Sequence, residues 1–138
     1  MYKRQYTHSL DNAIALSVEE RVNLHLFGGK LDHHARFFFE PTMLETLRRI
    51  AFDAAFIGAT AIAEDGVYFS YMEDAQVKQA AALSARQVVV VSETEKFQIQ
   101  APYRGLELGQ IDTLITDKKL AQTQKQWFPT KTDFLIGD

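Results

Sequence analysis

The sequence lacks cysteine, long apolar runs and any recognisable targeting segment. The absence of cysteine excludes disulfides and thiolate metal sites, and it suits a reducing compartment. No apolar run approaches the roughly 18 residues that a membrane span needs, and no signal-peptide pattern opens the chain. These absences predict a cytoplasmic protein that neither crosses nor enters a membrane.

Positive charge is not in excess either, because the formal net charge is −3 and the sequence pI is about 5.8. A free-standing DNA binder usually carries a basic stripe, since phosphate neutralisation supplies much of its affinity. The nearest approach to such a stripe is a set of C-terminal lysines: Lys118, Lys119, Lys125 and Lys131. Gln and Thr residues separate them, which favours a solvated surface. We therefore expect no duplex recognition by this chain alone.

The 138 residues, 46% of them hydrophobic, predict one domain with a buried core. Short β-branched or aromatic segments alternate with helical patterns, which predicts a layered α/β fold whose mostly parallel sheet is flanked by helices. Val88–Val91 is apolar without alternation and is expected at the centre of the sheet. The other expected strands are 22–27, 36–39, 54–59, 67–69, 111–115 and 133–136. Helices are expected after a Ser9 cap, after Pro41, over 72–84 and over 118–126.

Six short motifs occur in a fixed order along the chain. They are Thr7-His8-Ser9, Gly28-Gly29, Phe56-Ile57-Gly58-Ala59, Glu73-Asp74-Ala75-Gln76-Val77-Lys78, Glu93-Thr94-Glu95-Lys96-Phe97 and Ile111-Asp112-Thr113-Leu114-Ile115-Thr116-Asp117. In order and spacing they resemble the effector-sensing domain of DeoR-type bacterial transcriptional regulators, over residues 6 to about 118. The resemblance implies a ribose-phosphate isomerase or CoA-transferase-like scaffold, a phosphorylated sugar or related small anion as effector, homo-oligomers, and no cofactor.

The resemblance begins inside the sensor domain. Neither the N-terminal helix-turn-helix of such regulators nor the first phosphate-binding loop has a counterpart, so DNA would be contacted only through that missing module. Residues 1–5 resemble no part of the family and match a translated sequencing adapter. We therefore expect a non-native leader at 1–5, followed by a partial sensor domain at 6–138.

A phosphorylated sugar is an anion with several hydroxyl groups. Its pocket needs cations or free backbone N–H groups, together with carboxylates or amides. The resemblance indicates Lys78 and Lys96 as the cations and Glu73 as the carboxylate that binds hydroxyls. The remaining expected effector-binding residues are His8, Ser9, Gly28 and Thr60.

Each of these residues also has a structural interpretation. Lys78 follows Asp74 by four residues and is placed for an ordinary ion pair on a helix surface. Lys96 is equally consistent with a solvated loop lysine, and Glu73 with a favourable partner of a helix N-terminus. His33-His34 is not expected to bind a metal, because adjacent side chains diverge and no third ligand is near. Trp127-Phe128 is expected to pack the final helix and strand.

Two other functions remain open from the sequence. One is an aldose–ketose isomerase that uses Glu73 as base and Lys78 or Lys96 as electrostatic helper. Thr60-Ala61 argues against it, because the family usually has Asp-Gly there and related isomerases use a carboxylate near this strand to move protons. The other is a gene fragment without independent function that folds by self-association through an unpaired sheet edge.

Overall fold

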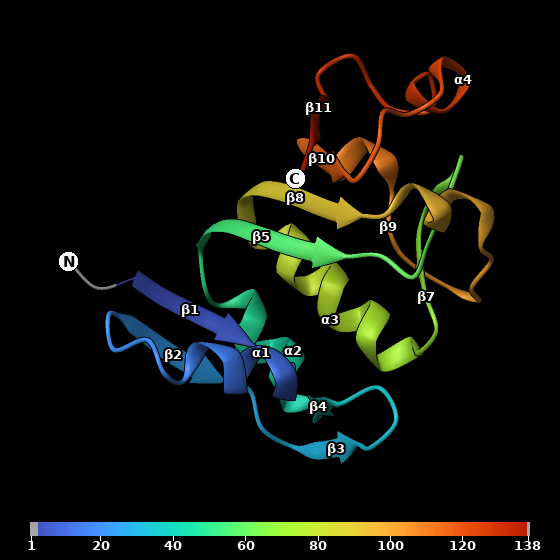
Figure 1. Ribbon diagram of the computed structural model, residues 1–138. Coiled ribbons are helices and arrows are strands. Elements are labelled where there is room, and N and C mark those ends of the chain that lie inside the picture. Colours follow the sequence, from blue (N-terminus) through green and yellow to red (C-terminus); the bar gives the residue numbers. More distant parts are fainter. Residues whose placement is uncertain (1–2, 138) are drawn as a thin grey trace. The chain divides into compact units, whose positions relative to one another are not determined.

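The computed structural model describes residues 3–137, which form two compact units (Figure 1). The first unit runs to Glu45 and the second begins at Thr46. Met1 and Tyr2, which belong to the expected leader, and Asp138 at the other end lie outside the described residues. Each unit is described by itself below.

The first unit contains a parallel strand pair and a hairpin. Its elements are β1 (Lys3–Thr7), α1 (Leu10–Leu16), β2 (Val22–Leu26), β3 (Lys30–Asp32) and β4 (Phe37–Phe39). β1 pairs with β2 in parallel, from Lys3 opposite Val22 onward, so the last three residues of the expected leader belong to a strand. The Ser9 hydroxyl accepts the backbone N–H of Asn12 at 3.1 Å, which confirms the predicted helix cap.

A parallel sheet of four strands forms the centre of the second unit, which confirms the predicted fold class. The sheet order is β11 (Asp133–Ile136), β10 (Thr113–Thr116), β8 (Ala85–Ser92), β5 (Phe52–Gly58). β8 therefore lies inside the sheet, as its apolar run predicts. Helix α3 (Met72–Leu83) packs against β5 and β8 (Figure 1). Helix α2 (Thr42–Arg48), which has residues in both units, begins after Pro41, as expected.

The second unit also contains an antiparallel sheet of three strands. It consists of β6 (Ala61–Ala63), β7 (Gly66–Phe69) and β9 (Tyr103–Leu106) in that order. Only β7 was predicted from the sequence. Gly105 allows β9 to pass close to its neighbours, because a Cβ there would lie 2.5 Å from the Phe69 ring and 3.1 Å from the Ala75 carbonyl oxygen.

The second unit is completed by short helical turns. They are the 3₁₀ turns η1 (Thr94–Gln98) and η2 (Leu108–Gln110) and the helix α4 (Gln122–Lys125). The last is shorter than the predicted helix over 118–126. The Thr116 hydroxyl donates to the Lys118 carbonyl at 2.7 Å and Leu120 is buried, so the chain turns inward before the helix begins.

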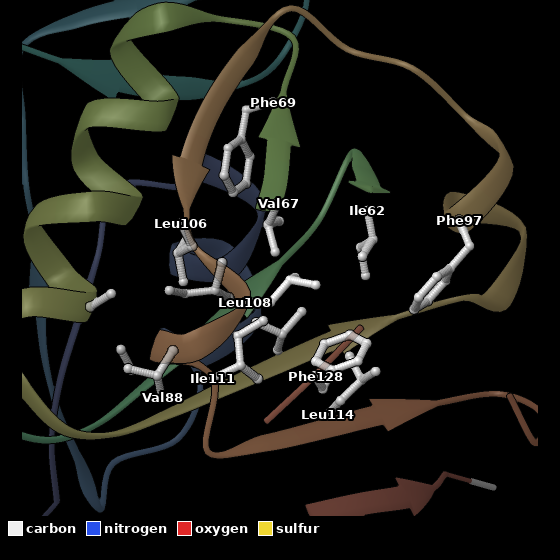
Figure 2. Packing of buried hydrophobic residues seen from close by; sticks show 14 of the residues in the cluster. Ile62, Val67, Phe69, Val88, Phe97, Leu106, Leu108, Ile111, Leu114 and Phe128 are labelled. Carbon is white, nitrogen blue, oxygen red and sulfur yellow. The ribbon is translucent and has the colours of Figure 1, made fainter. Parts of the chain in front are cut away.

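The core of the second unit lies between the two sheets. Figure 2 shows Val67, Phe69 and Leu106 of the antiparallel sheet pointing toward the same interior as Val88 and Leu114 of the parallel sheet. Aromatic rings close one side of this core. The Phe97 ring lies 6.0 Å from the Trp127 ring, and the Phe128 ring lies 5.4 Å from the Phe134 ring, centroid to centroid. The predicted packing role of Trp127-Phe128 is confirmed.

Within residues 3–137, no helix has both the length and the apolar character needed to span a membrane.

Candidate functional site

The motif Ile111–Asp117 joins the two inner strands of the parallel sheet at both ends. At the amino end, the Asp112 carboxylate accepts the backbone N–H of Val88 at 2.8 Å and the Lys131 ammonium at 3.1 Å. The hydrogen bond from Val88 is the main reason why the pKa of Asp112 is lowered, with Lys131 contributing further. Asp112 therefore ties β10 to β8.

At the carboxyl end of the same strands, the Asp117 carboxylate accepts the backbone N–H of Thr94 at 2.7 Å. This hydrogen bond is the main cause of the lowered pKa of Asp117. Thr94 is the first residue of η1, so Asp117 holds in place the turn that carries Lys96. Neither aspartate had a role predicted from the sequence. The available signal was an acidic residue directly before and directly after a strand.

Lys96 lies beyond the carboxyl end of β8, where ligands of open α/β sheets bind. Its ammonium is 3.9 Å from a Glu95 carboxylate oxygen, and the Glu95 side chain is 65% exposed. An exposed pair at this distance is weak, because solvent screens it. Lys96, whose own side chain is 29% exposed, thus has a longer and more exposed ion pair than Lys78 has.

Lys78 has a different environment. Its ammonium lies 3.5 Å from an Asp74 carboxylate oxygen, and the two side chains are only 19% and 18% exposed. The same ammonium lies 5.1 Å from the centre of the Phe69 ring, which is itself buried. The ion pair expected from the spacing of Asp74 and Lys78 is present, and it is more sheltered than an ordinary surface pair.

Thr60 and Glu73 lie toward the carboxyl end of β5 in the second unit. Ala61, the first residue of β6, pairs with Tyr68, and Thr60 directly precedes it. η1, which carries Lys96, packs against β6. The Phe52 N–H donates to the Ser84 carbonyl, which places the end of α3 at the amino end of β5 and its first turn, with Glu73, toward the carboxyl end.

The other predicted residues belong to the first unit, where they follow the carboxyl ends of its parallel strands. The His8 ring lies 5.6 Å from the Phe37 ring, and the Ser9 hydroxyl is engaged in the helix cap. Among the described residues, no atom lies within 4 Å of a Cβ built on Gly28. Gly29 differs, because its φ is 136° and a Cβ there would lie 2.5 Å from the Phe39 carbonyl oxygen. The backbone conformation and the close contact at position 29 therefore require glycine, whereas the space around Gly28 is open.

A family model described as the DeoR C terminal sensor domain matches residues 4–118. The chain belongs to the DeoR C-terminal sensor domain family. The match includes all six motifs, and it begins two residues before the boundary at 6 that the motifs indicate.

Three curated relatives share this DeoR region. An "HTH-type transcriptional repressor GlcR" from Bacillus subtilis is 35% identical over 81% of this chain and 43% of its own length. A "Putative aga operon transcriptional repressor" from Escherichia coli is 27% identical over 81% and 42%, respectively. A "Glycerol-3-phosphate regulon repressor" from Haemophilus influenzae is 31% identical over 82% and 44%. The chain therefore spans less than half the length of the relatives it matches.

This DeoR domain also has a hollow of about 130 Å³ at the carboxyl ends of β10 and β11. Its lining combines apolar side chains with lysines: Thr116, Lys119, Leu120, Lys125, Phe134, Leu135 and Ile136. No residue predicted for the effector site lines it, and most of the lining follows the matched region.

Metal ligands do not gather in the described part of the chain, where no group of three His, Cys, Asp or Glu side chains is placed to hold an ion. His33 and His34 lie in the turn between β3 and β4.

Proposed function

We propose that this chain is the effector-binding part of a carbohydrate-responsive transcriptional repressor, and that it binds a phosphorylated sugar or related small anion without transforming it. Membership of the DeoR sensor family and the names of the three relatives support this function, since all three relatives are repressors. One of those names includes a phosphorylated polyol, glycerol 3-phosphate.

The observation that carries the proposal is the setting of Lys96. A cation whose ion pair is 3.9 Å long and partly exposed lies beyond the carboxyl end of β8, on a turn fixed by the hydrogen bond from Thr94 to Asp117. An anionic effector needs a cation of this kind, since charge-assisted hydrogen bonds to phosphate are strong. Glu73 and Lys78, on the neighbouring helix, supply an acceptor and a donor for the rest of the molecule.

The residues at the end of β5 support binding without turnover. Thr60 and Ala61 occupy the place where related isomerases have a carboxylate, and neither side chain transfers protons near neutral pH. Ala61 is also 1% exposed, so it does not reach a ligand. The isomerase alternative would use Glu73 as base, and that side chain is exposed to water.

In the complete regulator, the effector would act through different affinities for two arrangements of the protein. DNA would be contacted by an N-terminal module, and the sensor domains would associate as homo-oligomers in the cytoplasm. These features are proposed by analogy with the family.

Thermal melting tests the proposal. The single tryptophan, Trp127, packs on Phe97, so its fluorescence reports unfolding of the second unit. A panel of glycerol 3-phosphate, pentose 5-phosphates and hexose 6-phosphates is expected to contain a ligand that raises the melting temperature. At a concentration 100-fold above Kd, binding stabilises by about 2.7 kcal/mol.

Lys96→Ala is expected to abolish this shift, whereas Lys131→Ala is the matched control and should retain it, because Lys131 pairs with Asp112 at the amino end of the strands. Two results would contradict the proposal: no shift with any member of the panel, or conversion of the bound compound to an isomer detected by NMR.

A further inference from the structure

The parallel sheet of the second unit ends at β11, whose outer edge pairs with no other strand of the described residues. β11 contains no lysine, arginine or proline, which are residues that commonly protect an edge strand from further pairing. Its Leu135 and Ile136 side chains are 54% and 60% exposed, and they lie on opposite faces of the sheet. The other edge strand, β5, exposes a large apolar side chain on one face only, that of Phe56. β11 is therefore the edge better suited to accept a further strand.

The backbone groups that β11 leaves unpaired follow from its ladder with β10. The N–H groups of Asp133 and Gly137 donate to carbonyl groups at the two ends of β10, at 2.9 Å and 2.8 Å. Because successive residues of a strand direct their backbone groups toward opposite edges, Leu135 also faces β10. Phe134 and Ile136 therefore direct their N–H and C=O groups toward the free edge.

These outward groups are complementary to those of a second copy of β11 that runs antiparallel to the first. In a hydrogen-bonded pair of an antiparallel ladder, the two opposite residues exchange both N–H···O bonds. If Phe134 lies opposite Ile136 of the second copy, twofold symmetry also places Ile136 opposite the second copy's Phe134. All outward N–H and C=O groups of both strands are then paired, which no other register achieves. In this register Leu135 lies opposite its own copy, on the twofold axis.

The same register brings opposite charges to the same end of the edge. Asp133 is the only charged residue of β11, and it lies opposite Gly137 of the second copy, so the two aspartates do not face each other. Gly137 follows the carboxyl end of β11, where the exposed Lys119 lines the hollow. Each copy thus offers an acid at one end of β11 and a lysine at the other, which is self-complementary about a twofold axis. Burial of Leu135 and Ile136 adds apolar stabilisation.

We propose that β11 is an association surface for a second copy of this chain, so that two four-stranded parallel sheets join edge to edge through an antiparallel β11 pair. This inference rests on the proposed function for the self-association of the domain, and it adds the surface and the register. Because β11 has only four residues, the interface is expected to be small, below about 1,200 Å². Monomer and dimer are therefore in a concentration-dependent equilibrium.

The absence of cysteine from the chain allows the register to be tested by disulfide cross-linking. Opposite residues of a non-hydrogen-bonded antiparallel pair have Cα atoms about 4.5 Å apart, which a disulfide spans. Leu135→Cys is therefore expected to give a covalent dimer under mild oxidation. Ile136→Cys is the matched control, because this position is slightly more exposed but its Cα lies more than about 7 Å from its own copy. It should cross-link roughly tenfold more slowly or not at all.

Sedimentation velocity over the micromolar concentration range measures the dimer without a cross-link. Leu135→Lys places like charges opposite each other, and Ile136→Pro removes an outward N–H that the ladder to β10 does not use. Each should raise the dissociation constant of the dimer by roughly tenfold or more. Phe56→Lys changes an exposed apolar residue on the other edge strand, so it is the control and should associate as the wild type does. Melting followed by Trp127 fluorescence establishes that each variant is folded.

Three results would overturn the proposed surface. They are a wild type that stays monomeric throughout this range, equal cross-linking by Leu135→Cys and Ile136→Cys, and a dimer that Phe56→Lys removes but Leu135→Lys retains. None of these results concerns the binding of sugar phosphates. Leu135→Lys should keep the melting shift that a member of the sugar phosphate panel gives, so a failure of the proposed function is recognised separately, by the absence of that shift in the wild type.

Discussion

Replacement of Asp112 by alanine tests the role of this carboxylate in joining the inner strands. The Val88 N–H donates to it at 2.8 Å, and Val88 is 4% exposed, so the variant leaves a buried donor without its partner. An unsatisfied buried group costs about 1–3 kcal/mol, whereas the half-exposed pair with Lys131 contributes at most about 1 kcal/mol. We expect a loss of about 2 kcal/mol at pH 7.

Urea unfolding followed by Trp127 fluorescence measures this loss, because the only tryptophan lies in the second unit. The hydrogen bond from Val88 lowers the pKa of Asp112 in the folded state below its ordinary value of 3.8. A lowered folded pKa stabilises at pH values above the unfolded pKa, and this contribution disappears as pH falls through the folded pKa. The difference between wild type and variant should therefore stay constant from pH 7 to about pH 5 and shrink below about pH 4.

Lys131→Gln is the control for the ion pair alone and should cost less than about 1 kcal/mol. If Asp112→Ala were as mild as Lys131→Gln, the hydrogen bond from Val88 would not be what stabilises the sheet here. A difference between wild type and Asp112→Ala that stayed unchanged at pH 3 would equally refute the argument, because the stabilising species is the carboxylate.

Two further substitutions test other parts of the structure. Gly29→Ala should destabilise the first unit by more than about 1 kcal/mol, because the φ of Gly29 is 136° and the added Cβ would meet the Phe39 carbonyl. Urea unfolding followed by circular dichroism measures this loss. Gly28→Ala is the control and should be close to neutral, so equal effects of the two substitutions would contradict this reasoning. Asp117→Ala removes the acceptor for the Thr94 N–H and should weaken glycerol 3-phosphate binding in NMR titrations several-fold; unchanged affinity would show that η1 needs no such support.

The strands with a strong apolar or aromatic signal were predicted well. Val88–Val91 lies inside the parallel sheet, and the predicted strand 133–136 has the observed bounds of β11. The cap at Ser9 was also predicted, because capping depends on local contacts that the sequence shows directly. Helix caps and continuous apolar segments are therefore the features that the sequence predicts best.

β6 and β9 were missed because their signals are weak outside the folded context. β6 is the short segment Ala61–Ala63, and β9 contains Gly105 in its interior, which ordinarily disfavours a strand. The structure explains the glycine, because Phe69 and the backbone of α3 lie too close for a Cβ. This close approach depends on contacts between residues thirty or more positions apart, which a local pattern does not contain.

For the charged residues of the candidate site too, the sequence did not show which groups surround each side chain in the folded protein. The spacing of Asp74 and Lys78 predicted an ion pair, and the structure has it, but spacing alone gave no measure of its burial or of the Phe69 ring beside it. Those two facts distinguish Lys78 from an ordinary surface lysine, because its ammonium has a sheltered carboxylate and an aromatic ring beside it. A motif therefore locates a lysine in the chain, whereas only the folded structure shows which groups surround it.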